Sequence, residues 1–139
     1  MLPTPAEPFM PHDAPMALID EILSCDEHSI TTRVTLHEHS LFLDAQQRIN
    51  ATIGIEYMAQ SAAAWSGYNA RNLRQEPPIG MLLGTRDYSS EVAYFHIGDV
   101  LTISAKCLMQ STEGMGSFDC HIEQQGKIVA QARLSVYQP

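Results

Sequence analysis

The sequence predicts an α+β fold in which an antiparallel sheet wraps around one long central helix. Two observations carry this prediction. The segment 51–72 is rich in alanine and carries little charge before Arg71, so it forms a helix that is apolar nearly all round and belongs in a core. Most of the remaining chain consists of short segments in which apolar and polar residues alternate, which is the pattern of half-buried strands.

Length and composition indicate one globular domain over residues 1–139. The chain has 139 residues, of which 45% are hydrophobic and 17% charged, which excludes disorder as the main state. The net charge of −8 argues against a nucleic-acid-binding protein, because such a groove needs clustered positive charge. We find no apolar run long enough to span a bilayer and no secretory signal, and the three cysteines are an odd number. These features predict a cytoplasmic protein with reduced thiols.

Before the helix, the chain predicts a proline-rich arm over 1–15, then strands over 16–24 and 29–37 that form a hairpin around Asp26 and Glu27. In 29–37 the residues Ile30, Thr32 and Val34 share one face. A polar connection over 38–50 leads to the helix, which Asn50 can cap.

After the helix, alternation predicts five more strands, with Gly126 in the turn between the last two. In the last strand, alternation places Ile128, Ala130 and Ala132 on one face. These strands cover 79–84, 91–96, 100–109, 115–124 and 127–137.

Glu56 is the residue that draws most attention, because it lies inside the helix expected to be most buried. A carboxyl group there must either find hydrogen-bond partners or have a raised pKa. A carboxyl in an apolar cleft suits general acid–base catalysis, whereas a structural glutamate at the helix start or at a subunit interface is the alternative. Gln60 lies one turn further on the same face.

The histidines offer several interpretations. His12 lies between prolines in PHDAPM and is either a site residue or a solvated loop residue. His37 and His39 form an HxH pair, which can bind a metal, but no third ligand at convincing spacing appears, so we expect neither metal nor cofactor. Motifs for a nucleophile elbow, a P-loop or a dinucleotide fold are also lacking.

Three segments together resemble the 3-hydroxyacyl-[acyl-carrier-protein] dehydratases, and among these most closely the ApeP-like dehydratases of aryl-polyene biosynthesis. They are PHDAPMALIDEIL, GIEYMAQSAAA and IGMLLGTRDYSSEVAYFHIGDVLTI. The resemblance covers nearly the whole chain in the same motif order. It implies the hot-dog fold, and a homodimer or heterodimer in which two sheets join edge to edge with acyl tunnels at the interface.

The resemblance also implies site residues. The catalytic glutamate of the family's E-x-M-A-Q helix matches Glu56, and its glutamine matches Gln60. The proline-flanked histidine matches His12. The family's H-F-P-G histidine has no counterpart, and His39 is the nearest histidine to that position.

Dehydration of a 3-hydroxyacyl thioester needs a base, an acid and dipoles for an enolate oxygen. We expect Glu56 to protonate the leaving hydroxyl and His39 or His12 to act as the base. Backbone amides at the helix start, around Thr52 and Gly54, are suited to the oxyanion, and Gly54 has no side chain to obstruct an acyl chain. The alternatives are a weak pseudo-dehydratase subunit that pairs with an active paralogue and a hot-dog thioesterase.

The expected partner is an acyl carrier protein with its phosphopantetheine-linked acyl chain. Carrier proteins are acidic, so an acidic chain would need a local basic patch to bind one. Arg71, Arg74 and Arg86 are the candidates, with scattered solubilising charges as the alternative.

Overall fold

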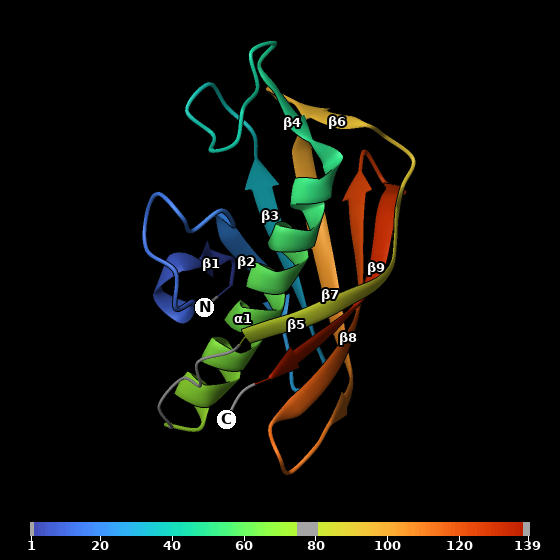
Figure 1. Ribbon diagram of the computed structural model, residues 1–139. Coiled ribbons are helices and arrows are strands. Elements are labelled where there is room, and N and C mark those ends of the chain that lie inside the picture. Colours follow the sequence, from blue (N-terminus) through green and yellow to red (C-terminus); the bar gives the residue numbers. More distant parts are fainter. Residues whose placement is uncertain (1, 75–80, 138–139) are drawn as a thin grey trace.

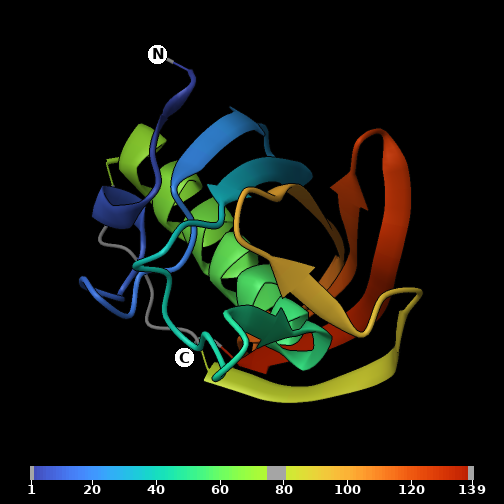
Figure 2. The same cartoon turned by 90° about the horizontal axis from the view of Figure 1, so that it is seen from above.

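A seven-stranded antiparallel sheet curves around one long helix (Figures 1 and 2), as the sequence predicts. The computed structural model describes residues 2–74 and 81–137. The strand order is β1-β2-β3-β7-β8-β9-β5, and β4 and β6 form a separate two-stranded sheet. The elements of the main sheet are β1 (Thr4–Pro5), β2 (Glu21–Cys25), β3 (Ser29–Thr35), β5 (Met81–Ser90), β7 (Val100–Gln110), β8 (Met115–Gln124) and β9 (Lys127–Tyr137).

The central helix begins where Asn50 caps the chain. The side-chain oxygen of Asn50 accepts a hydrogen bond from the Thr52 amide at 3.0 Å, as the sequence predicts. One 3-10 turn, η2 (Ala51–Ile53), precedes the helix proper, α1 (Gly54–Asn72), so the predicted start at residue 51 is a 3-10 turn. Most of the side chains of α1 are buried, because the sheet curves around the helix.

Alternation along the strands places one apolar face of the sheet against the helix. The buried side chains of three adjacent strands follow the predicted period of two: Ile30, Thr32 and Val34; Leu101, Ile103 and Ala105; Phe118, Cys120 and Ile122. In β9 the prediction fails at Ile128, which is 42% exposed while Val129 is buried. A register shift between β8 and β9 at this point is the reason, since a bulge moves the side chains of one strand to the opposite face.

Four predicted strands have different bounds. The segment 16–24 becomes strand only at Glu21, because residues 16–18 run across α1 and bond to Gln60 instead. The strand predicted over 29–37 ends at Thr35, where His37 enters a turn closed by Ser40. In 91–96 only β6 (Tyr94–His96) is strand, and it pairs with β4 (Arg48–Asn50) outside the main sheet. The strand predicted over 79–84 continues to Ser90, and residues 79 and 80 lie outside the described residues.

The remaining turns follow the sequence. The β2–β3 hairpin turns at Asp26, whose carboxylate accepts hydrogen bonds from the amides of His28 and Ser29. Between β8 and β9, Gln125 and Gly126 both have positive φ, which is the two-residue turn that matches the twist of a hairpin.

Burial raises the pKa of the Cys120 thiol to about 12, so that group stays protonated at neutral pH. No helix within 2–74 or 81–137 is both long and apolar enough to cross a membrane.

The proline-rich arm packs on the helix rather than extending into solvent. It contains β1 and a short 3-10 turn, η1 (Glu7–Phe9), and Ala6 is fully buried. Gly67 of α1 makes this packing possible, because a Cβ at that position would lie 1.9 Å from the carbonyl oxygen of Phe9. The Arg71 guanidinium donates a hydrogen bond to the Pro8 carbonyl and lies over the Phe9 ring.

We predict that Gly67→Ala destabilises the protein by about 1–3 kcal/mol, because the new methyl group overlaps backbone that cannot move independently of the arm. Urea unfolding followed by circular dichroism measures the change. Gly84→Ala is the matched control, since nothing lies within 4 Å of its added Cβ. Equal stabilities of the two variants would show that the arm does not pack on α1 as described.

Candidate functional site

Glu56 lies in the first turn of α1, on the side that faces the chain segment after His12. Its side chain is 38% exposed, so the carboxyl group sits at the edge of the core and not within it. One oxygen, Oε1, accepts a hydrogen bond from Gln60 Nε2 at 3.1 Å. The carboxyl group therefore has a hydrogen-bond partner, and Oε2 is left for other contacts.

Gln60 ties the helix to this segment, residues 11–18, which we call the strap. Its Oε1 accepts a hydrogen bond from the Leu18 amide at 2.8 Å, and its Nε2 donates to the Met16 carbonyl at 2.7 Å. The side chain is fully buried, so the amide faces the strap and Glu56 and not an open cavity. This arrangement fixes both the strap and one carboxylate oxygen with a single side chain.

His12 is the histidine that the strap brings to Glu56. Its Nε2 lies 3.9 Å from Glu56 Oε1, which is close but longer than a hydrogen bond. The ring is 31% exposed, and its Nδ1 is buried without a hydrogen-bond partner among the described residues. Of the two ring nitrogens, Nε2 is therefore the one that lies near the Glu56 carboxyl group.

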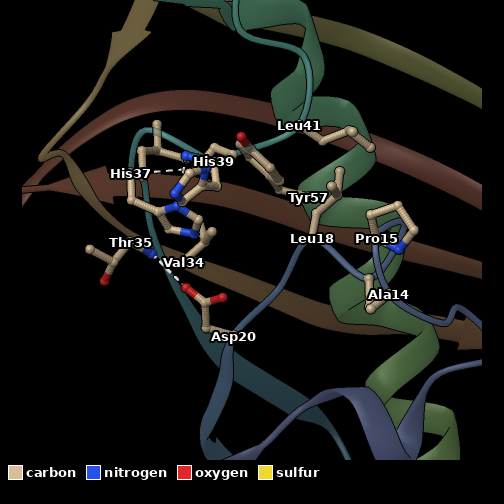
Figure 3. Close-up of a pocket in the computed structure, with 13 residues that line it drawn as sticks. Ala14, Pro15, Leu18, Asp20, Val34, Thr35, His37, His39, Leu41 and Tyr57 are labelled. Carbon is tan, nitrogen blue, oxygen red and sulfur yellow. Dashed lines mark hydrogen bonds between the residues drawn. The ribbon is translucent and has the colours of Figure 1, made fainter.

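His39, the other candidate base, lies elsewhere. Its side chain is 82% exposed, and its Nε2 is 3.5 Å from Glu38. Together with His37 it borders a separate pocket (Figure 3) that neither Glu56 nor His12 lines. Within one chain the structure thus pairs Glu56 with His12 and not with His39. The described residues contain no group of three potential metal ligands.

The start of the helix is more closed than the sequence indicates. The Thr52 amide is bonded to Asn50, and the Gly54 amide is bonded to backbone carbonyls of the preceding turn. Gly54 is buried, and a Cβ there would meet Tyr88 at 2.6 Å and Ile122 at 2.9 Å. In this chain, close packing is the physical reason for glycine at this position.

The three arginines expected to form a basic patch are all exposed, but their surroundings differ. Arg71 is engaged by the arm through Pro8 and Phe9. Arg74 follows the end of α1 with a positive φ of 58°, and Arg86 lies in β5, opposite Arg133 of β9.

The strap is the part of the site that sequence reasoning missed. Residues 16–18 look like the start of a strand, yet two of their backbone groups bond to Gln60. The presence of Gln60 in the helix was a sequence signal for such a segment. A polar amide in the middle of an apolar helix needs both a donor and an acceptor nearby, and a neighbouring segment without strand partners can supply them.

The comparisons with known proteins show the family of the chain. The profile of the ApeP-like family, described as ApeP dehydratase, matches residues 4–139. A chain of the dehydratase heterocomplex ApeI:P from Xenorhabdus doucetiae is 32% identical, with a TM-score of 0.93 over 98% of this chain and 91% of that one. No functionally curated protein sequence matches the chain significantly.

More distant structures share the fold alone. A hypothetical thioesterase with coenzyme A from Streptococcus pneumoniae is 16% identical, with a TM-score of 0.65 over 86% of this chain and 84% of that one. The PaaI protein of E. coli is 20% identical, with a TM-score of 0.64 over 88% of this chain and 84% of that one.

An antiparallel sheet wrapped around one long helix is the hot-dog fold. The chain belongs to the ApeP-like dehydratase family. It is therefore a dehydratase, that is, a lyase, of aryl-polyene biosynthesis. The resemblance found in the sequence is confirmed.

We predict that Gln60→Leu releases the strap. The substitution leaves the Leu18 amide and the Met16 carbonyl without their partner, so unfolding free energy should fall by about 1–3 kcal/mol. Amide hydrogen exchange at Leu18 should accelerate, whereas Gln110→Leu at an exposed strand position should leave it unchanged. Unchanged protection of Leu18 in Gln60→Leu would mean that the glutamine does not hold the strap.

Proposed function

We propose that the chain removes water from a 3-hydroxyacyl thioester carried by an acyl carrier protein, with Glu56 and His12 as the catalytic residues. The observation that supports this most directly is the 3.9 Å separation of His12 Nε2 and Glu56 Oε1 in a chain of the dehydratase family. Two groups this close can both contact neighbouring atoms of one substrate. Catalytic hydrogen bonds are often long before the substrate binds.

The elimination divides between the two side chains. His12 Nε2 takes the proton from the carbon next to the thioester carbonyl, and the electron pair of that C–H bond forms the new double bond. The C–O bond at the 3-position breaks, and the hydroxyl takes a proton from Glu56 Oε2 and leaves as water. His12 then holds one proton more and Glu56 one fewer, and a water molecule between them can return the proton and restore the starting state.

Gln60 supports this division of roles. Its hydrogen bond occupies Oε1, which leaves Oε2 as the oxygen that exchanges protons with the substrate. The same amide fixes Met16 and Leu18, four and six residues after His12. Gln60 therefore acts as a positioning residue, and it fixes both sides of the pair.

The partner proposal rests on the exposed edge of the sheet. Among the described residues β5 pairs only with β9, so its other edge is available to a second hot-dog subunit. The 32%-identical structure is the dehydratase heterocomplex ApeI:P, which supports a related but different subunit as the partner. A catalytically weak subunit that depends on this partner is the second candidate, because the H-F-P-G histidine is missing from this chain.

The carrier-protein proposal relies on exposed cations at the end of α1 and on β5. Reversing the charge of Arg71 would also loosen the arm, because its guanidinium holds Pro8 and Phe9. Arg74 and Arg86 form no ion pair with any described residue and are the cleaner positions for such a test. Because carrier-protein-dependent synthesis takes place in the cytoplasm, we place the chain there.

We predict that Glu56→Gln and His12→Gln each lower the dehydration rate by about 10²–10⁴-fold, because each removes a proton-transfer group. The assay follows conversion of a 3-hydroxyacyl carrier protein to the enoyl product by mass spectrometry. His39→Gln is the matched control and should retain the rate of the unmodified protein, because His39 is exposed and apart from Glu56. A large loss with His39→Gln but not with His12→Gln would reject our assignment of the base.

We also predict the outcome of adding the partner. The chain should dehydrate the substrate with its own Glu56, so Glu56→Gln should abolish at least this chain's share of turnover in the assembled complex. If Glu56→Gln leaves turnover in the complex unchanged, the chain is the supporting subunit of the second candidate function. Release of free acid in place of the enoyl product would instead show a thioesterase.

A further inference from the structure

The turn that starts α1 is bonded to the edge strand β5 and to the segment that follows β5. Ala51 opens this turn, five residues before Glu56. Its amide donates a hydrogen bond to the Ala93 carbonyl at 3.0 Å, and its carbonyl oxygen accepts one from the Tyr88 hydroxyl. Both backbone polar groups of Ala51 are therefore held by residues that lie outside the helix.

The side chain of Tyr88 also packs closely against the helix start. Its hydroxyl lies 2.6 Å from the position that a Cβ would take at Gly54, so a larger residue there would displace the tyrosine. Burial raises the pKa of the Tyr88 hydroxyl, which therefore stays protonated and donates to Ala51 at neutral pH. Tyr88 thus contacts the helix start through both packing and a hydrogen bond.

A β-bulge in β5 turns Tyr88 toward the helix. Three residue steps separate Arg86 from Ser89 in β5, whereas two steps separate their partners in β9. The extra residue leaves Arg86 and Asp87 both exposed, and the next side chain, Tyr88, points inward. Without the bulge, residue 88 would share the outer face with Arg86, because side chains alternate along a strand. The contact with Ala51 therefore depends on the bulge.

The bulge lies on a strand whose second edge is open to another subunit. Among the described residues β5 pairs only with β9, and Figure 2 shows β5, in yellow, at the margin of the sheet beside the start of α1. Asp87 has a φ of 57°, which aspartate tolerates better than β-branched residues do. Hydrogen bonds along the open edge would restrict the backbone of the bulge, and with it the direction of Tyr88.

We propose that Tyr88 is a positioning residue that links the pairing of β5 with a second subunit to the placement of Glu56. The inference rests on the proposed function, in which Glu56 exchanges a proton with the substrate. A related hot-dog subunit paired along β5 orders the bulge, and Tyr88 passes this order to the turn at Ala51 and to the first turn of α1. Tyr88 acts through the backbone of Ala51 and not on the reacting atoms.

Amide hydrogen exchange, with an ApeI-like dehydratase subunit as the partner, tests this link without any catalysis. The partner should slow exchange of the Ala51 and Gly54 amides about threefold to tenfold, because both amides are bonded at the turn that Tyr88 holds. Tyr88→Phe removes only the hydroxyl and should abolish this slowing. Tyr94→Phe is the matched control and should retain it, because the Tyr94 hydroxyl has no hydrogen bond to a described residue. Equal slowing in Tyr88→Phe, or none in the unmodified protein, overturns the proposal.

Kinetics of the assembled complex separate positioning from a merely structural role. Tyr88→Phe should lower kcat roughly threefold to tenfold and leave KM within about twofold, because substrate binding does not use the hydroxyl. Asp87→Val should show the same loss of kcat relative to Asp87→Gly, since glycine adopts a positive φ freely and valine does not. Both Asp87 variants lack the carboxylate, so they differ in backbone preference. A change in KM alone, or equal kcat values for the two Asp87 variants, contradicts the proposal.

Failure of the proposed function would give a different result from failure of this link. Full turnover by Glu56→Gln would reject the proposed role of Glu56. Slowing of the Ala51 amide that still depends on Tyr88 in the same variant would support the link between β5 and the helix start.

Discussion

The site depends on one buried side-chain amide, that of Gln60, whose oxygen and nitrogen must both form hydrogen bonds. Gln60 is fully buried in a helix that otherwise offers it no partners, so its oxygen and nitrogen must bond outside the helix or to Glu56. The strap supplies an amide at Leu18 and a carbonyl at Met16. Meeting this requirement stops residues 16–18 from joining the sheet and brings His12 to the carboxylate. The hydrogen bonds of Gln60 therefore determine both the path of the strap and the position of His12 beside Glu56.

The surrounding fold makes this constraint effective. The curved sheet buries most of α1, so the polar side chains of the helix have few places to find partners. Close packing of Phe9 on Gly67 fixes the arm before the strap begins, and Gln60 fixes the strap after His12. The imidazole is thus held between two attached segments. Such support from neighbouring contacts gives a catalytic group a defined position before the substrate arrives.

The sequence was sufficient for the architecture because burial imposes a period on each element. The apolar helix and the strands β7, β8 and β9 were predictable for this reason, whereas the resemblance to the dehydratase family came from three sequence motifs. The predicted placement of Ile128 on the buried face was wrong because a bulge is a local change of register that alternation alone does not reveal. The strand prediction was wrong over 16–20 because the backbone there bonds to a side chain 42 residues away. A local sequence pattern carries no information on such a contact.

The candidate site was predictable in part. Glu56, Gln60 and His12 were named from the sequence, but the choice between His12 and His39 required the distance of 3.9 Å and the exposure of His39.

A structure of the chain, assembled with its partner, bound to a stable 3-hydroxyacyl-pantetheine analogue would test the central claim most directly. The account predicts the 3-hydroxyl within hydrogen-bond distance of the Glu56 carboxyl group and the adjacent carbon facing His12 Nε2. A ligand whose 3-hydroxyl lies beyond the reach of Glu56, or whose adjacent carbon faces a histidine of the partner in place of His12, would contradict it.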